Sequence, residues 1–104
     1  MLYFDSTKSK FTDGQPHAIF ALPPNDDGVI PVTVRVRNAD DLFYLGMLAD
    51  VANHNRIKVG LTISYLMGGR MDRRIDDNQP FTLRMVCEYI NSLKFEWVNV
   101  IEPH

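Results

Sequence analysis

The sequence predicts a single α/β domain, with a parallel or mixed sheet flanked by helices. The chain has 104 residues, a length that builds one hydrophobic core. From residue 32 onward, apolar segments of strand length alternate with segments of helical periodicity, and turn-forming residues separate them. We therefore treat residues 1–104 as one structural unit.

The first third of the chain has the pattern of short strands. We expect them at Leu2–Phe4, at residues 17–22 ("HAIFAL") and at residues 30–36 ("IPVTVRV"). Turn signals at Thr12–Gly14 and in "PPNDDG" at residues 23–28 separate these strands. Two turns between short strands predict an antiparallel start to the domain.

A helix is expected to follow the third strand. Asn38 or Asp40 can cap its first turn, and apolar residues recur every three or four positions as far as about His54. Residues 58–66 ("KVGLTISYL") then read as a strand that is buried on both sides, because apolar residues crowd it with little alternation. This strand would be central in the sheet.

A second helix is expected from about Pro80, a residue that the first turn of a helix tolerates. Cys87 lies on its apolar stripe, which indicates packing rather than chemistry. Residues 97–101 ("WVNVI") form the last expected strand, with Phe95 and Trp97 packing it. The order of strands and helices from residue 32 predicts right-handed crossovers onto a parallel sheet.

Composition restricts the classes of partner. A net charge of −2 provides no overall field for nucleic acid or anionic lipid, so any anion site must be local. The single cysteine excludes an intramolecular disulfide and favours a reducing compartment. No apolar run reaches the roughly 20 residues that span a bilayer, and charged residues interrupt the first twenty positions. We expect a cytoplasmic protein that binds neither nucleic acid nor membranes.

Two segments follow the expected parallel strands and so occupy the edge where open α/β sheets bind ligands: residues 66–79 and residues 102–104 ("EPH"). Gly68 and Gly69 allow positive φ and a close approach of backbone N–H groups to a ligand. His104 follows the carboxyl end of the strand 97–101, where a neutral imidazole can ligate a metal or transfer protons. If the two strands are neighbours, both segments face one crevice.

The charged side chains of residues 66–79 allow two interpretations. Arginine guanidinium groups suit phosphate oxygens, and Asp72 could support an arginine or accept from an amine. Alternatively, the aspartates simply pair with the arginines on a solvated loop. The side chains in question are Arg70, Asp72, Arg73, Arg74, Asp76 and Asp77. In the functional interpretation, Asp76 and Asp77 cap or solvate the start of the next helix.

The stretch "FTDGQ" at residues 11–15 also has two interpretations. Asp13–Gly14 is a strong turn dipeptide, so the stretch can be a hairpin corner with Phe11 tucked inward. Alternatively, Phe11 stacks on a planar base, and Asp13 or Gln15 hydrogen-bonds that base.

The chain has no P-loop, GxGxxG, HExxH or paired-cysteine motif. Four of its segments nevertheless resemble, in order and spacing, the N-terminal domain of ribose-phosphate diphosphokinase (PRPP synthetase). They are "FTDGQ", "YLMGGRMDRR" at residues 65–74, "QPFTLR" at residues 79–84 and the strand that ends in "EPH". Three positions depart from the family pattern: Gln15 and Met71, which indicate a divergent branch, and Glu102–Pro103, a change that bears on metal binding. The resemblance implies a phosphoribosyltransferase-like half-domain.

The resemblance also implies roles for individual residues. Phe11 and Asp13, with Gln15 beside them, match the element that holds the adenine of ATP and that one subunit contributes to its neighbour's site. Arg70, Asp72 and Arg73 match the loop that grips ATP from the other side. His104 matches a catalytic histidine associated with Mg²⁺ and the phosphates.

The implied reaction transfers the β,γ-diphosphate of ATP to ribose 5-phosphate, giving phosphoribosyl diphosphate and AMP. The family's ribose 5-phosphate loop, catalytic lysine loop and metal-binding aspartate lie beyond the matched region. We therefore expect this chain to be the first part of such an enzyme, inactive alone and self-associating through exposed sheet edges. The alternative is a non-catalytic homologue that binds nucleotide or a full-length partner and regulates it.

Overall fold

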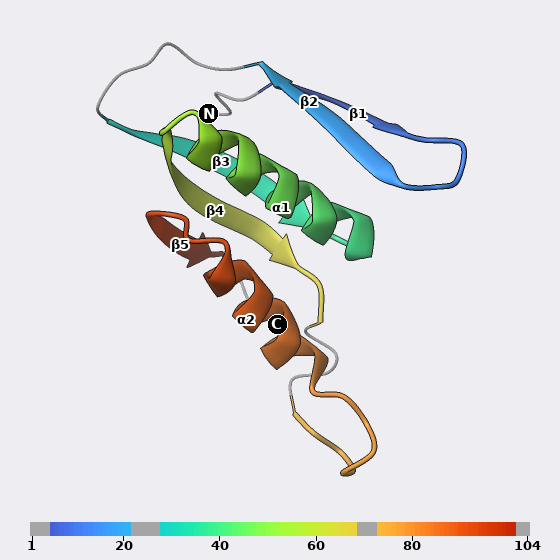
Figure 1. Ribbon diagram of the computed structural model, residues 1–104. Helices are drawn as coiled ribbons and strands as arrows, with labels where there is room; N and C mark the ends of the chain where they lie inside the picture. The colour runs from blue at the N-terminus through green and yellow to red at the C-terminus, as the bar shows by residue number, and fades with distance from the viewer. Residues whose placement is uncertain (1–4, 22–27, 69–72, 102–104) are drawn as a thin grey trace.

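The computed structural model describes residues 5–21, 28–68 and 73–101 (Figure 1). Five strands and two helices occupy these ranges, and the α/β class is confirmed. In chain order they are β1 (Asp5–Lys10), β2 (Pro16–Ala21), β3 (Val29–Val36), α1 (Ala39–His54), β4 (Lys58–Leu66), α2 (Thr82–Ser92) and β5 (Trp97–Val100).

The strands form two separate sheets. β3, β4 and β5 make a parallel sheet in that order, whereas β1 and β2 make an antiparallel hairpin. The expected antiparallel start holds only for β2, which pairs antiparallel with β1, a strand that was not expected. It is wrong for the third expected strand, because β3 pairs in parallel with β4 while β2 packs on α1. The strand expected at Leu2–Phe4 lies outside the described residues, and the polar strand β1 was not predicted.

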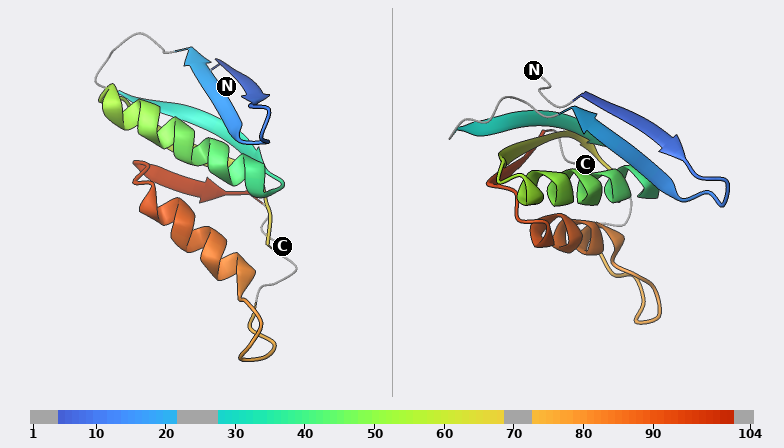
Figure 2. Two further views of the ribbon diagram at one scale, coloured as in Figure 1. Left: turned by 45° about the vertical axis from the view of Figure 1, so that its right-hand side comes forward. Right: turned by 45° about the horizontal axis from the view of Figure 1, so that its top comes forward.

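Both helices cover the same face of the parallel sheet (Figure 2). The most deeply buried side chains come from the two longest strands: Val32 and Val36 of β3, and Leu61 and Ile63 of β4. The expectation that β4 is buried on both sides holds only for its first half. Its Tyr65, the register partner of the exposed Arg35, is itself 49% exposed.

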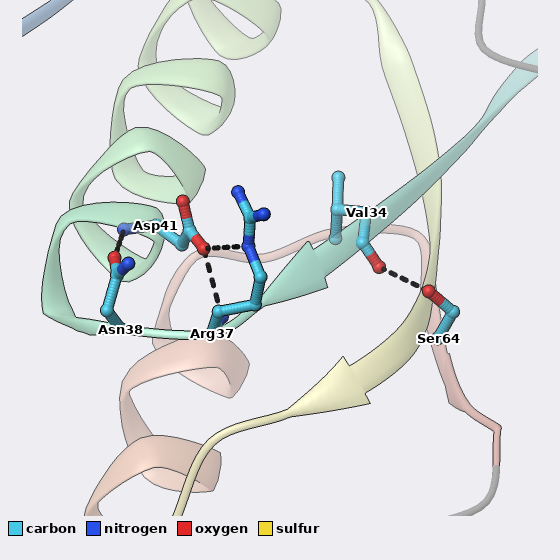
Figure 3. A network of polar contacts seen from close by, with 5 residues as sticks. All are labelled: Val34, Arg37, Asn38, Asp41 and Ser64. Carbon is cyan, nitrogen blue, oxygen red and sulfur yellow. Dashed lines mark hydrogen bonds and ion pairs between the residues drawn. The ribbon is translucent and has the colours of Figure 1, made fainter.

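A β-bulge at Ser64 explains why the second half of β4 differs from the first. Val34 is paired with Ile63, but the next residue of β3, Arg35, is paired with Tyr65, so Ser64 is the extra residue. The Ser64 hydroxyl donates a hydrogen bond to the Val34 carbonyl at 3.3 Å (Figure 3). The bulge thus shifts the alternation of β4 near the edge where ligands of such sheets bind.

The start of α1 is fixed by Asn38, one of the two expected caps. The Asn38 Oδ1 accepts a hydrogen bond from the Asp41 N–H at 3.0 Å. The buried Asp41 carboxylate accepts from Arg37 twice, from its backbone N–H at 2.9 Å and from its Nε at 3.3 Å (Figure 3). The helix ends at His54, as predicted.

The helix α2 begins two residues later than expected, at Thr82, and no side chain caps it. Val86 and Ile90 form its buried line. Cys87 is exposed, so its expected burial is wrong. Cys87 follows the buried Val86 directly, and adjacent residues of an α-helix point about 100° apart around its axis. The Cys87 thiol therefore lies outside the face of α2 that packs on the sheet. No helix in the described ranges is long and apolar enough to cross a membrane.

Candidate functional site

The two segments expected to form a crevice start from neighbouring strands. β4 and β5 are parallel, with Gly60–Ile63 opposite Trp97–Val100, and the Ile101 N–H donates to the Ile63 carbonyl at 2.9 Å. After β4, the Met67 N–H donates to the Val36 carbonyl at 2.7 Å. Gly68 then has φ of 95°, the positive value that the glycine pair was expected to permit. Both chain segments therefore leave the sheet at the same edge.

The part of the loop described by the structure is organised around Gln79. Arg74 Nη1 donates to the Gln79 carbonyl at 2.7 Å, and Gln79 Nε2 donates to Asp76 Oδ2 at 3.3 Å. The ion pairs of the solvated-loop interpretation do not occur among the arginines and aspartates of residues 73–77. Asp76 bonds Gln79 instead of capping α2, and Asp77 is solvent-exposed.

Arg73 is the one predicted ATP-binding residue of this loop that the structure describes. Its side chain is exposed, and none of the hydrogen bonds or ion pairs within the described ranges involves it. The other expected residues of this edge, Arg70, Asp72 and His104, lie outside the described residues.

The stretch Phe11–Gln15 is the turn of the β1–β2 hairpin. The Phe11 N–H donates to the Gln15 carbonyl and the Gly14 N–H to the Phe11 carbonyl, both at 2.9 Å, and Gly14 has φ of 91°. Asp13 Oδ1 accepts from the Gln15 N–H at 3.1 Å, which closes an Asx turn. Asp13 thus stabilises the turn itself, and one of its carboxylate oxygens is already used.

The ring of Phe11 is half-exposed, at 50%, so the expectation that it tucks inward is wrong. Its centroid lies 5.1 Å from that of His17, with the rings tilted by 35°. A tilted aromatic neighbour holds the Phe11 ring in place while leaving much of it in contact with solvent. The ring is therefore available to contact a ligand or another chain.

The hairpin turn lies away from the described stretch of chain that leads into α2 (Figures 1 and 2). No hydrogen bond or ion pair among the described residues joins the Phe11–Gln15 turn to Arg73.

The hairpin is attached to the first turns of α1. Lys10 Nζ lies 2.8 Å from Asp40 Oδ2, and the Tyr44 hydroxyl donates to the Ser9 carbonyl at 3.2 Å. The hydrogen bond and the charge of Asp40 raise the pKa of Lys10 above its ordinary value of 10.5. Lys8 Nζ lies 4.8 Å above the Tyr44 ring, in a cation–π contact.

Sequence reasoning missed a cavity of about 280 Å³ between the hairpin, β3 and α1. The spacing Asn38-x-x-Asp41 is a capping signal that could have indicated the Asp41 network on its wall. No local signal could have revealed the cavity, since its walls come from separate elements. They are lined by Lys8, Phe20, Val32, Thr33, Val34, Arg35, Arg37, Asp41, Tyr44, Leu45 and Leu48.

In the described ranges, no three His, Cys, Asp or Glu side chains group as a metal site would require. The residue expected to act with Mg²⁺, His104, is outside those ranges. Comparison of the sequence with protein-family models and with curated proteins finds no match.

Proposed function

We propose that this chain supplies part of the ATP site of a diphosphokinase that acts on ribose 5-phosphate. The observation that carries the proposal is the parallel pairing of β4 with β5. This pairing starts the arginine-bearing loop and the "EPH" segment from adjacent strands, at the edge where α/β sheets bind ligands. Phosphate groups would approach the arginines of one segment and the histidine of the other.

The chemistry of these residue types fits transfer of a diphosphate group. Arg70 and Arg73 offer guanidinium donors that offset negative charge on phosphate oxygens. His104 would accompany a bound Mg²⁺, and that ion would supply positive charge beside the transferred diphosphate. Asp72 would orient an arginine or accept a hydrogen bond from the adenine amine.

The hairpin turn would complete the site from a second copy. The half-exposed Phe11 ring offers an aromatic face for adenine. The second oxygen of Asp13 and the exposed side chain of Gln15 offer hydrogen-bonding groups. Because the turn lies away from the described stretch of chain that leads into α2, we propose a homo-oligomer in which each ATP contacts two subunits.

Calorimetric titration with MgATP tests the site. We expect Arg70→Ala and Arg73→Ala each to weaken binding at least about tenfold, the usual cost of losing a hydrogen bond to a charged group. Lys58→Ala is the matched control, because it removes an exposed cation from the opposite end of β4 and should leave affinity unchanged. Equal affinity of the wild type and Arg70→Ala would contradict the assignment.

Mixing two defective variants tests whether the site is shared. Phe11→Ala and Arg70→Ala chains should each bind MgATP weakly alone, and their mixture should recover part of the binding, since some interfaces then hold both intact elements. Sedimentation should show the oligomer that this requires. A monomer mass that does not change with concentration would contradict the proposed oligomer. Separately, release of AMP from ATP and ribose 5-phosphate by this chain alone would contradict its expected inactivity.

A further inference from the structure

A gap separates the two sheets at a place remote from the proposed nucleotide contacts. β3 pairs with β4 on one edge and β2 pairs with β1 on one edge, and among the described strands neither has a partner on its other edge. The hairpin lies beside the β3 edge of the parallel sheet, on the side away from β4 (Figures 1 and 2). The cavity of about 280 Å³ occupies this gap.

The cavity follows the backbone of β3. Its wall includes four consecutive residues of that strand, 32–35, although successive side chains of a strand point to opposite faces. A wall of consecutive residues therefore exposes the edge of the strand rather than one face. Leu45 and Leu48 of α1 form an apolar floor, and Phe20 of β2 lies on the other side.

Alternate residues of β3 direct their peptide groups toward this gap. The Val34 and Val36 carbonyls are bonded from the β4 side, by the Ser64 hydroxyl and by the Met67 N–H. Because the N–H and C=O groups of alternate residues face opposite edges in a parallel sheet, those of Thr33 and Arg35 face the gap. Pro31 is the preceding residue in the series Pro31, Thr33 and Arg35, so its peptide nitrogen also faces the gap. That nitrogen carries no hydrogen, and proline at such a position is typical of an edge strand.

The walls of the gap carry positive charge. Lys8 and Arg35 line it, and neither is in an ion pair with another described residue. Arg37 also lines the gap, but the buried carboxylate of Asp41 compensates its charge. An occupant with carboxylates thus complements the two remaining cations.

We propose that this gap binds an extended acidic segment of a partner polypeptide, which adds as a strand to the free edge of β3. Peptide groups of the segment would bond those of Thr33 and Arg35, as in other cases of strand addition. Its apolar side chains would face Leu45 and Leu48, and its alternate carboxylates would lie beside Arg35 on the other face. The segment fills space that the two sheets leave between them.

Two end-capped peptides test this proposal by amide NMR: Glu-Val-Glu-Val-Glu-Val-Glu and its counterpart with lysine in place of glutamate. The acidic peptide should bind at least about tenfold more tightly, because it faces cations that repel the other. It should also slow hydrogen exchange of the Thr33 and Arg35 amides at least about tenfold, since bonded amides are protected. Equal binding of both peptides, no binding, or protection confined to other residues would overturn the proposal.

Two variants test the contacts separately. Thr33→Pro removes one outward N–H without removing a bond to β4 and should weaken binding of the acidic peptide, with urea unfolding used to check the fold. Arg35→Glu should abolish the preference for the acidic peptide, because the gap then carries one cation and one carboxylate, whereas Lys58→Glu, on the neighbouring strand, should keep it. If the free protein forms a dimer that Thr33→Pro dissociates, the edge belongs to a second copy and the proposal of a partner segment is wrong.

Discussion

A substitution at Gly60 tests how β4 and β5 are held together. Gly60 is buried in β4, and Trp97 of β5 is its register partner. A Cβ at Gly60 would overlap the indole atoms Cε2 and Cζ2 of Trp97, so Gly60→Ala must displace the ring. Trp97 is 40% exposed, and the ring can therefore move only toward solvent.

The magnitude follows from the area that the displaced ring exposes. A large aromatic side chain buries roughly 150–250 Å² when covered, and more than half of Trp97 is covered, so displacement exposes on the order of 100 Å². At about 25 cal/mol per Å², the loss is about 2.5 kcal/mol. Overpacking of a well-packed site costs about 1–3 kcal/mol, which agrees. We expect Gly60→Ala to lower the free energy of unfolding by about 2–3 kcal/mol.

A double-mutant cycle with Gly60→Ala and Trp97→Ala measures this change by urea unfolding. Unfolding is followed by circular dichroism rather than by tryptophan fluorescence, because Trp97→Ala removes the chain's only tryptophan. In the Trp97→Ala background the clash is absent. Gly60 does not have positive φ, so alanine is then expected to stabilise β4 by about 0.5–1 kcal/mol. The effect of Gly60→Ala therefore changes sign between the two backgrounds. The same cost in both would refute the packing that we infer.

Two further predictions concern α1 and its contacts. Asn38→Ala should lower the free energy of unfolding by about 1 kcal/mol, as measured in urea, because the Asp41 N–H loses its side-chain acceptor; no change would show that the cap is unimportant. Asp40 raises the pKa of Lys10 in the folded protein, so the Lys10–Asp40 ion pair stabilises the attachment of the hairpin fully below pH 10.5. This contribution is lost as the pH rises through the raised pKa of Lys10 in the folded protein. NMR titration of the Lys10 side chain should show a lower pKa in Asp40→Asn, and an identical titration would contradict the cause that we assign.

Elements with strong periodicity could be predicted from the sequence. The helix Ala39–His54 and the strand Lys58–Leu66 match their expected ranges, because the apolar spacing of each is local information. The strand Asp5–Lys10 (DSTKSK) has no such pattern, and its conformation depends on cross-strand pairing with β2. Cys87 was misplaced because a stripe defined by spacing does not say how far around the helix the packing extends.

The candidate site divides in the same way. The turn at Phe11–Gln15 and the adjacency of the segments after β4 and β5 follow from turn residues and element order. The exposure of the Phe11 ring could not be predicted in this way, because it depends on which other elements pack against the hairpin turn. The ion pairs that the charge pattern allowed do not form between Arg74 and Asp76. Arg74 instead donates to the Gln79 carbonyl, and Asp76 accepts from the Gln79 side-chain amide.

Attachment of the hairpin to α1 links the two proposals while leaving them separable. The Tyr44 hydroxyl bond to Ser9 and the Lys10–Asp40 pair fix the hairpin where its turn projects outward and where β2 stays apart from β3. A hairpin that paired directly with β3 would close the gap and redirect Phe11. Weakening its attachment should therefore alter both MgATP and peptide binding, whereas Arg35→Glu should change only peptide binding and Arg70→Ala only MgATP binding. In both proposals the attachment of the hairpin would set the geometry, and different side chains would select each ligand.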